Sequence, residues 1–153
     1  MVKYVVLLAL LGLAAAEIAE FKKCTESPED VCVINEVRIT PCKKPSSCKL
    51  KLGTVSSISF DMTPGFSTTK LKAGLFLAKE GEGQDVPFPE LYEADACQYT
   101  GCPMEAGKKQ TLDYSLRLGK KLPSGKFPFK FKVWDEEDKT KNCCFRTNVE
   151  LRK

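Results

Sequence analysis

Histidine is absent from the 153 residues, and the chain also lacks an acceptor site for N-linked glycans. Without histidine there is no side chain whose ordinary pKa lies near neutral pH, which disfavours general acid–base catalysis and the common zinc sites. Asn35, Asn142 and Asn148 are the only asparagines, and none has a serine or threonine two positions later. Because that spacing defines the acceptor, we do not expect glycan-dependent lysosomal sorting.

Blocks of like charge and long apolar runs are also missing from most of the chain. Lys and Arg number 24 against 20 Asp and Glu, and this net charge of +4 is too evenly spread to indicate nucleic-acid binding. The one apolar run, Val5 to Leu13, is shorter than the roughly 20 residues that cross a bilayer. Lys3 precedes it and three alanines at 14–16 follow, so we expect residues 1–16 to be a secretory signal peptide. Residues 17–153 then suit one exported, extracellular domain, which we expect to be monomeric.

Cysteine is abundant, with eight residues that all follow position 16. An even count in an exported chain indicates a disulfide framework rather than a metal site. Four of the cysteines bracket the short segments KKPSS and QYTG, and should form the local bridges Cys42 to Cys48 and Cys97 to Cys102. The other four would tie the N-terminal segment to the last strand, by joining Cys24 and Cys32 to Cys143 and Cys144 in an order that stays open. Since neighbours in a strand point to opposite faces, one of the last two should point inward and one outward.

Residues suited to catalysis are hard to find. No cysteine is free if all eight pair, and no serine lies in a nucleophile-elbow context. The carboxylates of Asp135, Glu136, Glu137 and Asp138 lie in the segment DEEDKTKN, which is typical of a solvated turn. We therefore expect a protein that is not an enzyme and needs neither a metal nor a cofactor.

Apolar residues alternate with polar ones along two segments that surround a short polar turn. They are Leu112–Leu118 and Phe127–Val133, and each has one apolar and one polar face. The connection GKKLPSG has the composition of a hairpin turn, so we expect these two segments to form a hairpin.

Five further segments have the pattern of strands, and other stretches do not. The further strands are Val31–Thr40 with a break near Asn35, Leu50–Leu52 as a short edge piece, Val55–Met62, Thr69–Lys79 with a short helix as its alternative, and Cys143–Leu151. Val86-Pro87-Phe88-Pro89 cannot be a central strand because proline offers no ladder hydrogen bond. Glu80–Asp85 and Leu91–Gly101 have the composition of loops. Seven or so short strands predict an all-β sandwich of two antiparallel sheets.

The inner faces of this sandwich are almost free of polar residues, which leaves two arrangements open. The sheets can close to about 10 Å and interdigitate, or they can splay around an apolar guest. Four disulfides, at about 2 to 4 kcal/mol each, would offset the weaker packing around such a cavity. The inner-face residues are Phe60, Met62, Leu71, Leu75, Leu116, Leu118, Phe127, Phe129, Phe131 and Val133.

Several motifs together carry a family resemblance. They are the run Cys97-Gln-Tyr-Thr-Gly-Cys102-Pro103-Met104 with Gly107, the preceding Val86-Pro87-Phe88-Pro89, the segment Val33–Val37, and the loop from Pro41-Cys42 to Cys48. This set resembles the MD-2-related lipid-recognition (ML) family over essentially all of residues 17–153, and within it the Niemann-Pick type C2 proteins of arthropod type and the mite group 2 allergens. The resemblance implies an immunoglobulin-like sandwich that opens between its sheets and binds a sterol, fatty acid or other lipid without catalysis.

The resemblance also implies roles for individual residues. Phe88 matches a loop phenylalanine that contacts the guest at the mouth of the cavity, and Leu118 and Leu122 match apolar positions at the same entrance, the latter often aromatic. Val86, Tyr114 and Phe145 complete the predicted lining. The family pattern implies the disulfides Cys24–Cys144, Cys42–Cys48 and Cys97–Cys102, and it leaves Cys32 and Cys143 for each other.

Two functions remain open at this point. The first is a secreted lipid carrier, in which Lys120, Lys121 or Lys126 meets a carboxylate or makes transient contact with an anionic membrane surface, although a solvated turn also explains these lysines. The second is a secreted interaction module in innate immune or chemical recognition. Such a module would have a filled core or a lipid co-ligand, and its loops would recognise a receptor protein.

Overall fold

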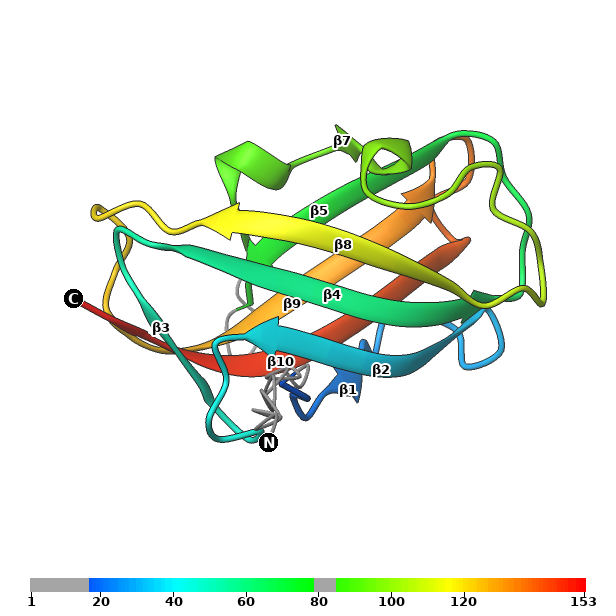
Figure 1. The fold of residues 1–153 in the computed structure, drawn as a ribbon. Helices are drawn as coiled ribbons and strands as arrows, with labels where there is room; N and C mark the ends of the chain where they lie inside the picture. The colour runs from blue at the N-terminus through cyan, green and yellow to red at the C-terminus, as the bar shows by residue number, and fades with distance from the viewer. Residues whose placement is uncertain (1–16, 79–84) are drawn as a thin grey trace, which may run out of the picture.

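Two β-sheets packed face to face make up the computed structural model, which describes residues 17–78 and 85–153 (Figure 1). The predicted signal peptide, and all but Asp85 of the predicted loop Glu80–Asp85, lie outside these residues. The smaller sheet has the order β2-β4-β8, with β2 at Cys32–Thr40, β4 at Val55–Pro64 and β8 at Gln110–Arg117. Both of its pairings are antiparallel.

The larger sheet has seven strands built around three long ones. Its central order is β10-β9-β5, with β10 at Asn142–Arg152, β9 at Gly125–Asp135 and β5 at Leu71–Leu77. Short strands line both edges: β1 at Lys22–Lys23 and β3 at Cys48–Lys51 pair with β10, whereas β6 at Val86–Pro87 and β7 at Ala94–Asp95 pair with β5. The β3–β10 pair is parallel, and the other pairs of this sheet are antiparallel.

The predicted strand segments are confirmed, including the irregularity near Asn35. The register between β2 and β4 shifts between Ile34 and Glu36, so that one extra residue lies on β2. Such a bulge moves the inward register by one position. Burial follows this shift, because Cys32 is buried before it whereas Val37 and Ile39 are buried after it.

The predicted hairpin between residues 112–118 and 127–133 is wrong. β8 pairs with β4 in the smaller sheet, whereas β9 lies between β5 and β10 in the larger one. The connection therefore passes from one sheet to the other, and the two apolar faces meet across the interior. Glycine, proline and serine allow the chain to turn but do not decide which strand it pairs with next.

The segment between β6 and β8 closes one side of the sandwich. It contains two short 3-10 turns, Pro89–Leu91 and Ala96–Gln98, and the second of them lies within the predicted loop Leu91–Gly101. Its strand β7 pairs with β5, and further along the Tyr99 carbonyl accepts the N–H of Asp113 on β8 at 3.0 Å. The segment thereby bridges the free edges of both sheets.

All four predicted disulfides are present. Two close short loops, Cys42–Cys48 and Cys97–Cys102, and two join distant parts of the chain, Cys24–Cys144 and Cys32–Cys143. Cys143 belongs to the apolar core between the sheets, together with its partner Cys32. Its neighbour Cys144 lies on the opposite face of β10, as strand geometry requires.

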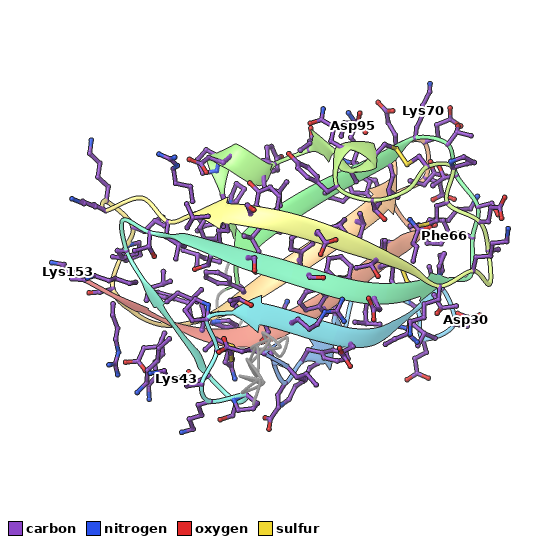
Figure 2. All side chains as sticks on the ribbon, viewed as in Figure 1. Asp30, Lys43, Phe66, Lys70, Asp95 and Lys153 are labelled. Carbon is purple, nitrogen blue, oxygen red and sulfur yellow. A yellow bond between two sulfur atoms is a disulfide. The ribbon has the colours of Figure 1, made fainter. Side chains whose placement is uncertain are left out.

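Charged side chains lie at the periphery of the sandwich, as the labelled Lys43, Lys70, Asp95 and Lys153 illustrate (Figure 2). Within residues 17–78 and 85–153, no helix has the length and apolar character needed to cross a membrane.

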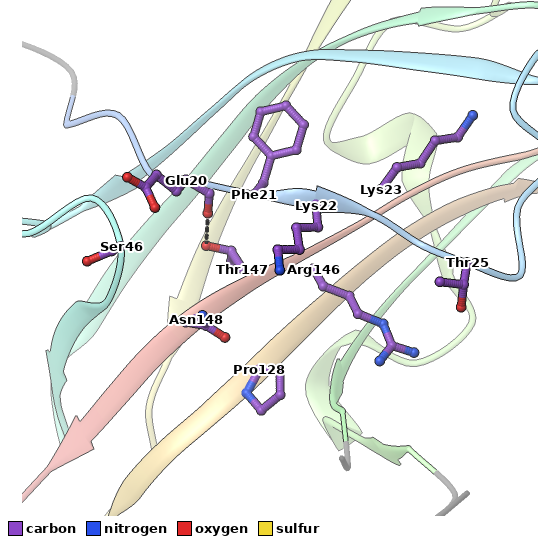
Figure 3. A pocket seen from close by; sticks show the side chains of 10 residues that line it. All are labelled: Glu20, Phe21, Lys22, Lys23, Thr25, Ser46, Pro128, Arg146, Thr147 and Asn148. Carbon is purple, nitrogen blue, oxygen red and sulfur yellow. Dashed lines mark hydrogen bonds between the residues drawn. The ribbon is translucent and has the colours of Figure 1, made fainter. Parts of the chain in front are cut away.

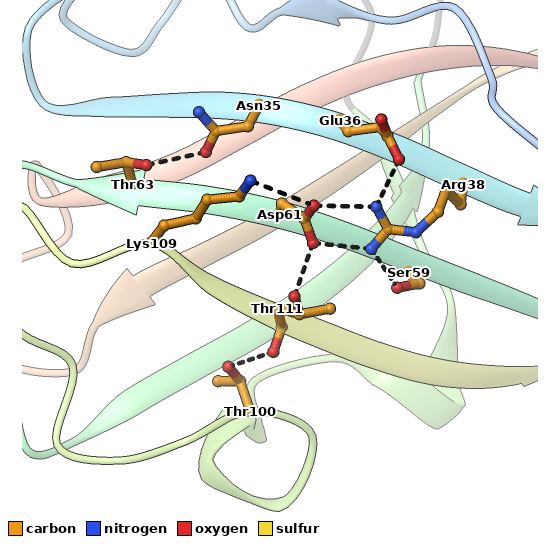
Figure 4. A network of polar contacts seen from close by, with 9 residues as sticks. All are labelled: Asn35, Glu36, Arg38, Ser59, Asp61, Thr63, Thr100, Lys109 and Thr111. Atoms are coloured by element: carbon orange, nitrogen blue, oxygen red, sulfur yellow. Dashed lines mark hydrogen bonds and ion pairs between the residues drawn. The ribbon is translucent and has the colours of Figure 1, made fainter. Parts of the chain in front are cut away.

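A polar network covers the outer face of the smaller sheet (Figure 4). Arg38 donates two parallel hydrogen bonds to the Asp61 carboxylate, at 2.8 and 3.0 Å, and also pairs with Glu36 at 2.8 Å. The Thr111 hydroxyl donates to the same carboxylate at 2.7 Å, so that β2, β4 and β8 are linked. The hydrogen bonds from Arg38 and then Thr111 lower the pKa of Asp61 to about 2.

Asp61 should therefore contribute to stability in a pH-dependent way. Its folded-state pKa lies below its ordinary value of 3.8, so the contribution is complete above about pH 4 and is lost as the pH falls through about 2. We expect Asp61→Asn to lower the free energy of unfolding at pH 7 by about 1 to 2 kcal/mol. Urea unfolding measured from pH 7 to pH 2 should show the two proteins converging at the acid end. If the free energies of unfolding of the two proteins differed by the same amount at every pH, the pH-dependent role of Asp61 would be contradicted. Thr111→Val should also lower the free energy of unfolding, but by less than Asp61→Asn.

Candidate functional site

Aromatic rings from both sheets meet at the centre of the interior. Phe60 on β4 lies with its ring centroid 5.0 Å from that of Phe131 on β9 and 5.0 Å from that of Phe145 on β10. The last two rings stack at 6.0 Å. The rings fill the space between the sheets at this point, so a guest molecule could enter only if they moved apart.

Most of the predicted lining residues are brought together in this interior. The buried ones are Phe60, Met62, Leu71, Leu75, Phe88, Tyr114, Leu116, Leu118, Phe129, Phe131, Val133 and Phe145. Leu122 and Phe127 are half-buried and pack against the same cluster. Alternation therefore identified the inner faces correctly, and the role of these residues in binding remains a prediction.

Val86 is the exception, because its side chain is 46 % exposed. It lies on the edge strand β6 opposite Leu77, outside the buried cluster. Its neighbour Phe88 turns inward instead, with its ring 5.3 Å from that of Phe129. A strand of two residues, Val86–Pro87, gives no alternation from which the inward side could be predicted.

One end of the sandwich carries the predicted mouth residues. The turn between β3 and β4 and the connection from β8 to β9 lie side by side there (Figure 1). The Gly53 N–H donates to the Leu118 carbonyl at 2.6 Å, and the Leu118 N–H donates to the Thr54 carbonyl at 2.9 Å. The side chain of Lys120 packs over Gly53, whose φ of +80° favours glycine. Leu118 is fully buried, whereas Leu122 remains half-buried.

Few polar side chains are buried among the described residues, and the charged one of these is Asp135 at the end of β9. Burial is the main cause that raises the pKa of Tyr114, with smaller effects of Tyr99 and Glu90, so this phenol stays protonated at neutral pH. The Thr147 hydroxyl is satisfied, because it donates to the Glu20 carbonyl at 2.8 Å. The Ser56 hydroxyl is buried and has no hydrogen-bond partner in the part of the chain that the structure describes.

Sequence reasoning missed Ser56 although a signal was available. Ser56 precedes Ile58, Phe60 and Met62 at intervals of two, so it shares their inward face on β4. The predicted strand Val55–Met62 contains Ser56, but only its apolar residues were assigned to the inner face. Several other core residues follow the same alternation and were left out of the predicted lining, namely Val37, Ile39, Leu112, Val149 and Leu151.

A hollow on the outer face of the larger sheet differs from the interior (Figure 3). Its volume is about 290 Å³, and both Lys22 and Arg146 line it. These two residues are direct partners on β1 and β10, and like charges in that position repel each other. Glu26 lies 3.8 Å from the Arg146 guanidinium and also pairs with Lys130. Such a charged surface does not suit an apolar guest, so the candidate site is the interior.

Comparisons with known proteins agree with this architecture. The ML domain family matches residues 19–151. An MD-2-related lipid-recognition protein of Manduca sexta is 46% identical over 151 residues, which cover 98% of this chain and 97% of the relative. The NPC intracellular cholesterol transporter 2 of Mus musculus is 32% identical over 152 residues, 96% of this chain and 94% of the relative.

A solved structure shows the same fold. The Niemann-Pick type C2 protein from Japanese carpenter ant superposes with a TM-score of 0.72 at 19% identity, covering 87% of this chain and 99% of that protein. Together with the sequence matches over nearly the whole chain, the two-sheet architecture and the four disulfides lead to one conclusion: this chain belongs to the ML domain family.

Proposed function

We propose that this protein is an exported, non-enzymatic carrier that binds a sterol, fatty acid or similar lipid between its two sheets. The observation that supports this function is the apolar interior, which contains aliphatic and aromatic side chains and lies between two separate sheets. In the described residues, the edge strands β5 and β8 of these sheets do not pair with each other. Relatives named for lipid recognition and cholesterol transport support the same assignment. Export follows from the signal-peptide pattern of residues 1–16, and we infer an extracellular location.

The driving force would be the transfer of apolar surface out of water. A guest that buries roughly 300 Å² gains about 7 kcal/mol before the costs of ordering are subtracted. Part of that gain is offset, because the rings of Phe60, Phe131 and Phe145 must separate from one another to admit the guest. Selectivity would then come from the shape of the guest and from the few polar groups inside.

The direct ring contacts also favour a second candidate, a secreted interaction module with a filled core. Native mass spectrometry and organic extraction of protein purified from a lipid-containing host separate the two. A carrier should release a stoichiometric lipid, whereas a module should be empty and should also fail to take up added sterol or fatty acid. The second result would overturn the carrier.

Leu122 offers a test at the mouth, because it is half-buried and its replacement should disturb the fold little. We expect Leu122→Asp to weaken uptake of a fluorescent sterol about tenfold, since a carboxylate would have to be desolvated at the entrance. The thermal midpoint should shift by only a few degrees, on the order of 1 kcal/mol. Val33→Asp is the matched control, because Val33 is 55 % exposed and pairs with Thr63 at the opposite end of the sandwich. Equal uptake by the two variants would contradict an entrance at Leu122.

A further inference from the structure

A buried hydroxyl without a partner lies on the inner face of the smaller sheet. Ser56 is 2 % exposed, and no hydrogen bond to its Oγ is found within residues 17–78 and 85–153. Buried polar groups in proteins are nearly always hydrogen-bonded, and leaving one unsatisfied is destabilising. The surrounding side chains on the same strand face, Ile58 and Phe60, are apolar and cannot satisfy it.

The position of Ser56 relates it to the entrance of the proposed site. It pairs with Leu116 on β8. Thr54 and Leu118, which are hydrogen-bonded to each other at the mouth, lie two residues from Ser56 and Leu116 respectively. Two residues of a strand span about 7 Å, so the hydroxyl lies just inside that end. Further inward the same face continues with Ile58, Phe60 and Met62. Polarity therefore falls from the mouth toward the centre along β4.

We propose that Ser56 is the polar contact for the head group of the guest, and that the guest is a neutral lipid alcohol such as a sterol. This inference rests on the proposed function and narrows its ligand class. A single hydroxyl can exchange one hydrogen bond with an alcohol, and the buried Ser56 oxygen is then satisfied. An ionised carboxylate at the same depth would need stronger compensation, and no charged group is buried beside Ser56 on β4. Because polarity falls along β4 from the mouth toward the centre, the apolar body of the guest lies over Ile58 and Phe60.

The test compares two ligands that differ only in the head group. Cholesterol and cholest-5-ene, which lacks the oxygen, compete against a fluorescent sterol for the wild-type protein, for Ser56→Ala and for Ser57→Ala. Ser57 is the matched control, because it is the next residue on β4 and is exposed on the outer face. We expect the wild type and Ser57→Ala to prefer cholesterol about tenfold, and Ser56→Ala to bind both ligands with nearly equal affinity.

A second measurement separates this role from a purely structural one. In the absence of any sterol, Ser56→Ala should raise the urea midpoint of unfolding, because it removes an unsatisfied buried group. Added cholesterol should then raise the midpoint of the wild type more than that of the variant. If both sterols bind but the preference for cholesterol survives in Ser56→Ala, the Ser56 inference fails and the carrier stands. If neither sterol nor fatty acid binds the wild type, the proposed function itself fails, and the inference fails with it.

Discussion

Removal of both long-range disulfides should cost about 2 kcal/mol more stability than the two single removals added together. Cys24–Cys144 and Cys32–Cys143 span 120 and 111 residues, and they meet β10 at adjacent positions. When one bridge is present, the other closes only about ten additional residues, so a single removal should cost about 3 kcal/mol. Without both, a loop of more than 100 residues opens and the total loss is about 8 kcal/mol. Since domains of this kind are stable by about 5 to 15 kcal/mol, the protein without both bridges should lose more than half of its free energy of unfolding.

Urea unfolding of variants in which paired cysteines are replaced by alanine measures these values. Cys42–Cys48 is the control, because it closes a separation of only six residues and lies at the β2–β3 connection. Its removal should act independently of the other bridges and add its own loss to theirs. Strict additivity of the two long-range bridges would contradict the view that they act as one tie between β2, the N-terminal segment and β10.

Phe131→Ala is expected to give the second large effect, a loss of about 4 kcal/mol in the free energy of unfolding. The ring contacts Phe60 on the opposite sheet and lies 6.0 Å from Phe145 and 6.4 Å from Tyr114. Its removal leaves an apolar space in the region where we place the guest. A saturating sterol should therefore recover more stability in this variant than in the wild type, by up to about 3 kcal/mol at a hundredfold excess over the Kd.

The matched control is Phe76→Ala on the outer face of β5. Its ring is half-buried and contacts Tyr92 and Lys130 rather than the interior. We expect a loss of about 1 to 2 kcal/mol that sterol does not recover, measured by the same urea titrations with and without ligand. If sterol stabilised both variants equally, the guest would not occupy the space beside Phe131.

Phe88 and Leu118 illustrate how the structure changes an expectation drawn from their assignment to the mouth. On that assignment, truncating either residue would weaken uptake with little change in thermal stability. Both are buried, and Phe88 packs against Phe129, so truncation to alanine should also cost stability. Leu122 is the better probe because it remains half-buried.

Much of the architecture could be predicted because its signal is local. Alternation along Val55–Met62, Phe127–Val133 and Cys143–Leu151 identifies both strand and inner face, since a side chain in a strand changes sides at each residue. The break at Asn35 was visible for the same reason, as a change in the phase of the apolar positions. The family resemblance supplied the long-range cysteine pairing, which spacing left open.

The errors concern information that is not local. Which strand β8 and β9 pair with depends on the competing edges of β4, β5 and β10, and the turn sequence between them does not encode it. The direction of Val86 depends on its pairing with Leu77, and two residues give no period. Whether Phe60 meets Phe131 or leaves a gap depends on how closely two whole sheets approach, which composition does not specify.

The placement of the covalent ties makes the two long sides of the sandwich unequal. The disulfides of Cys143 and Cys144 join β10 to β2 and to the N-terminal segment. The β5 and β8 edges are instead joined through hydrogen bonds, those of residues 94–100 and those between Thr68 and Met104. If the two sheets separate, the disulfide-bonded side at β10 and β2 acts as the hinge, and the opposite side at β5 and β8 opens. The distance between the sheets would then increase more at Tyr114 on β8 than at Val37 on β2. The breaking of the hydrogen bonds of residues 94–100 would set the rate of opening.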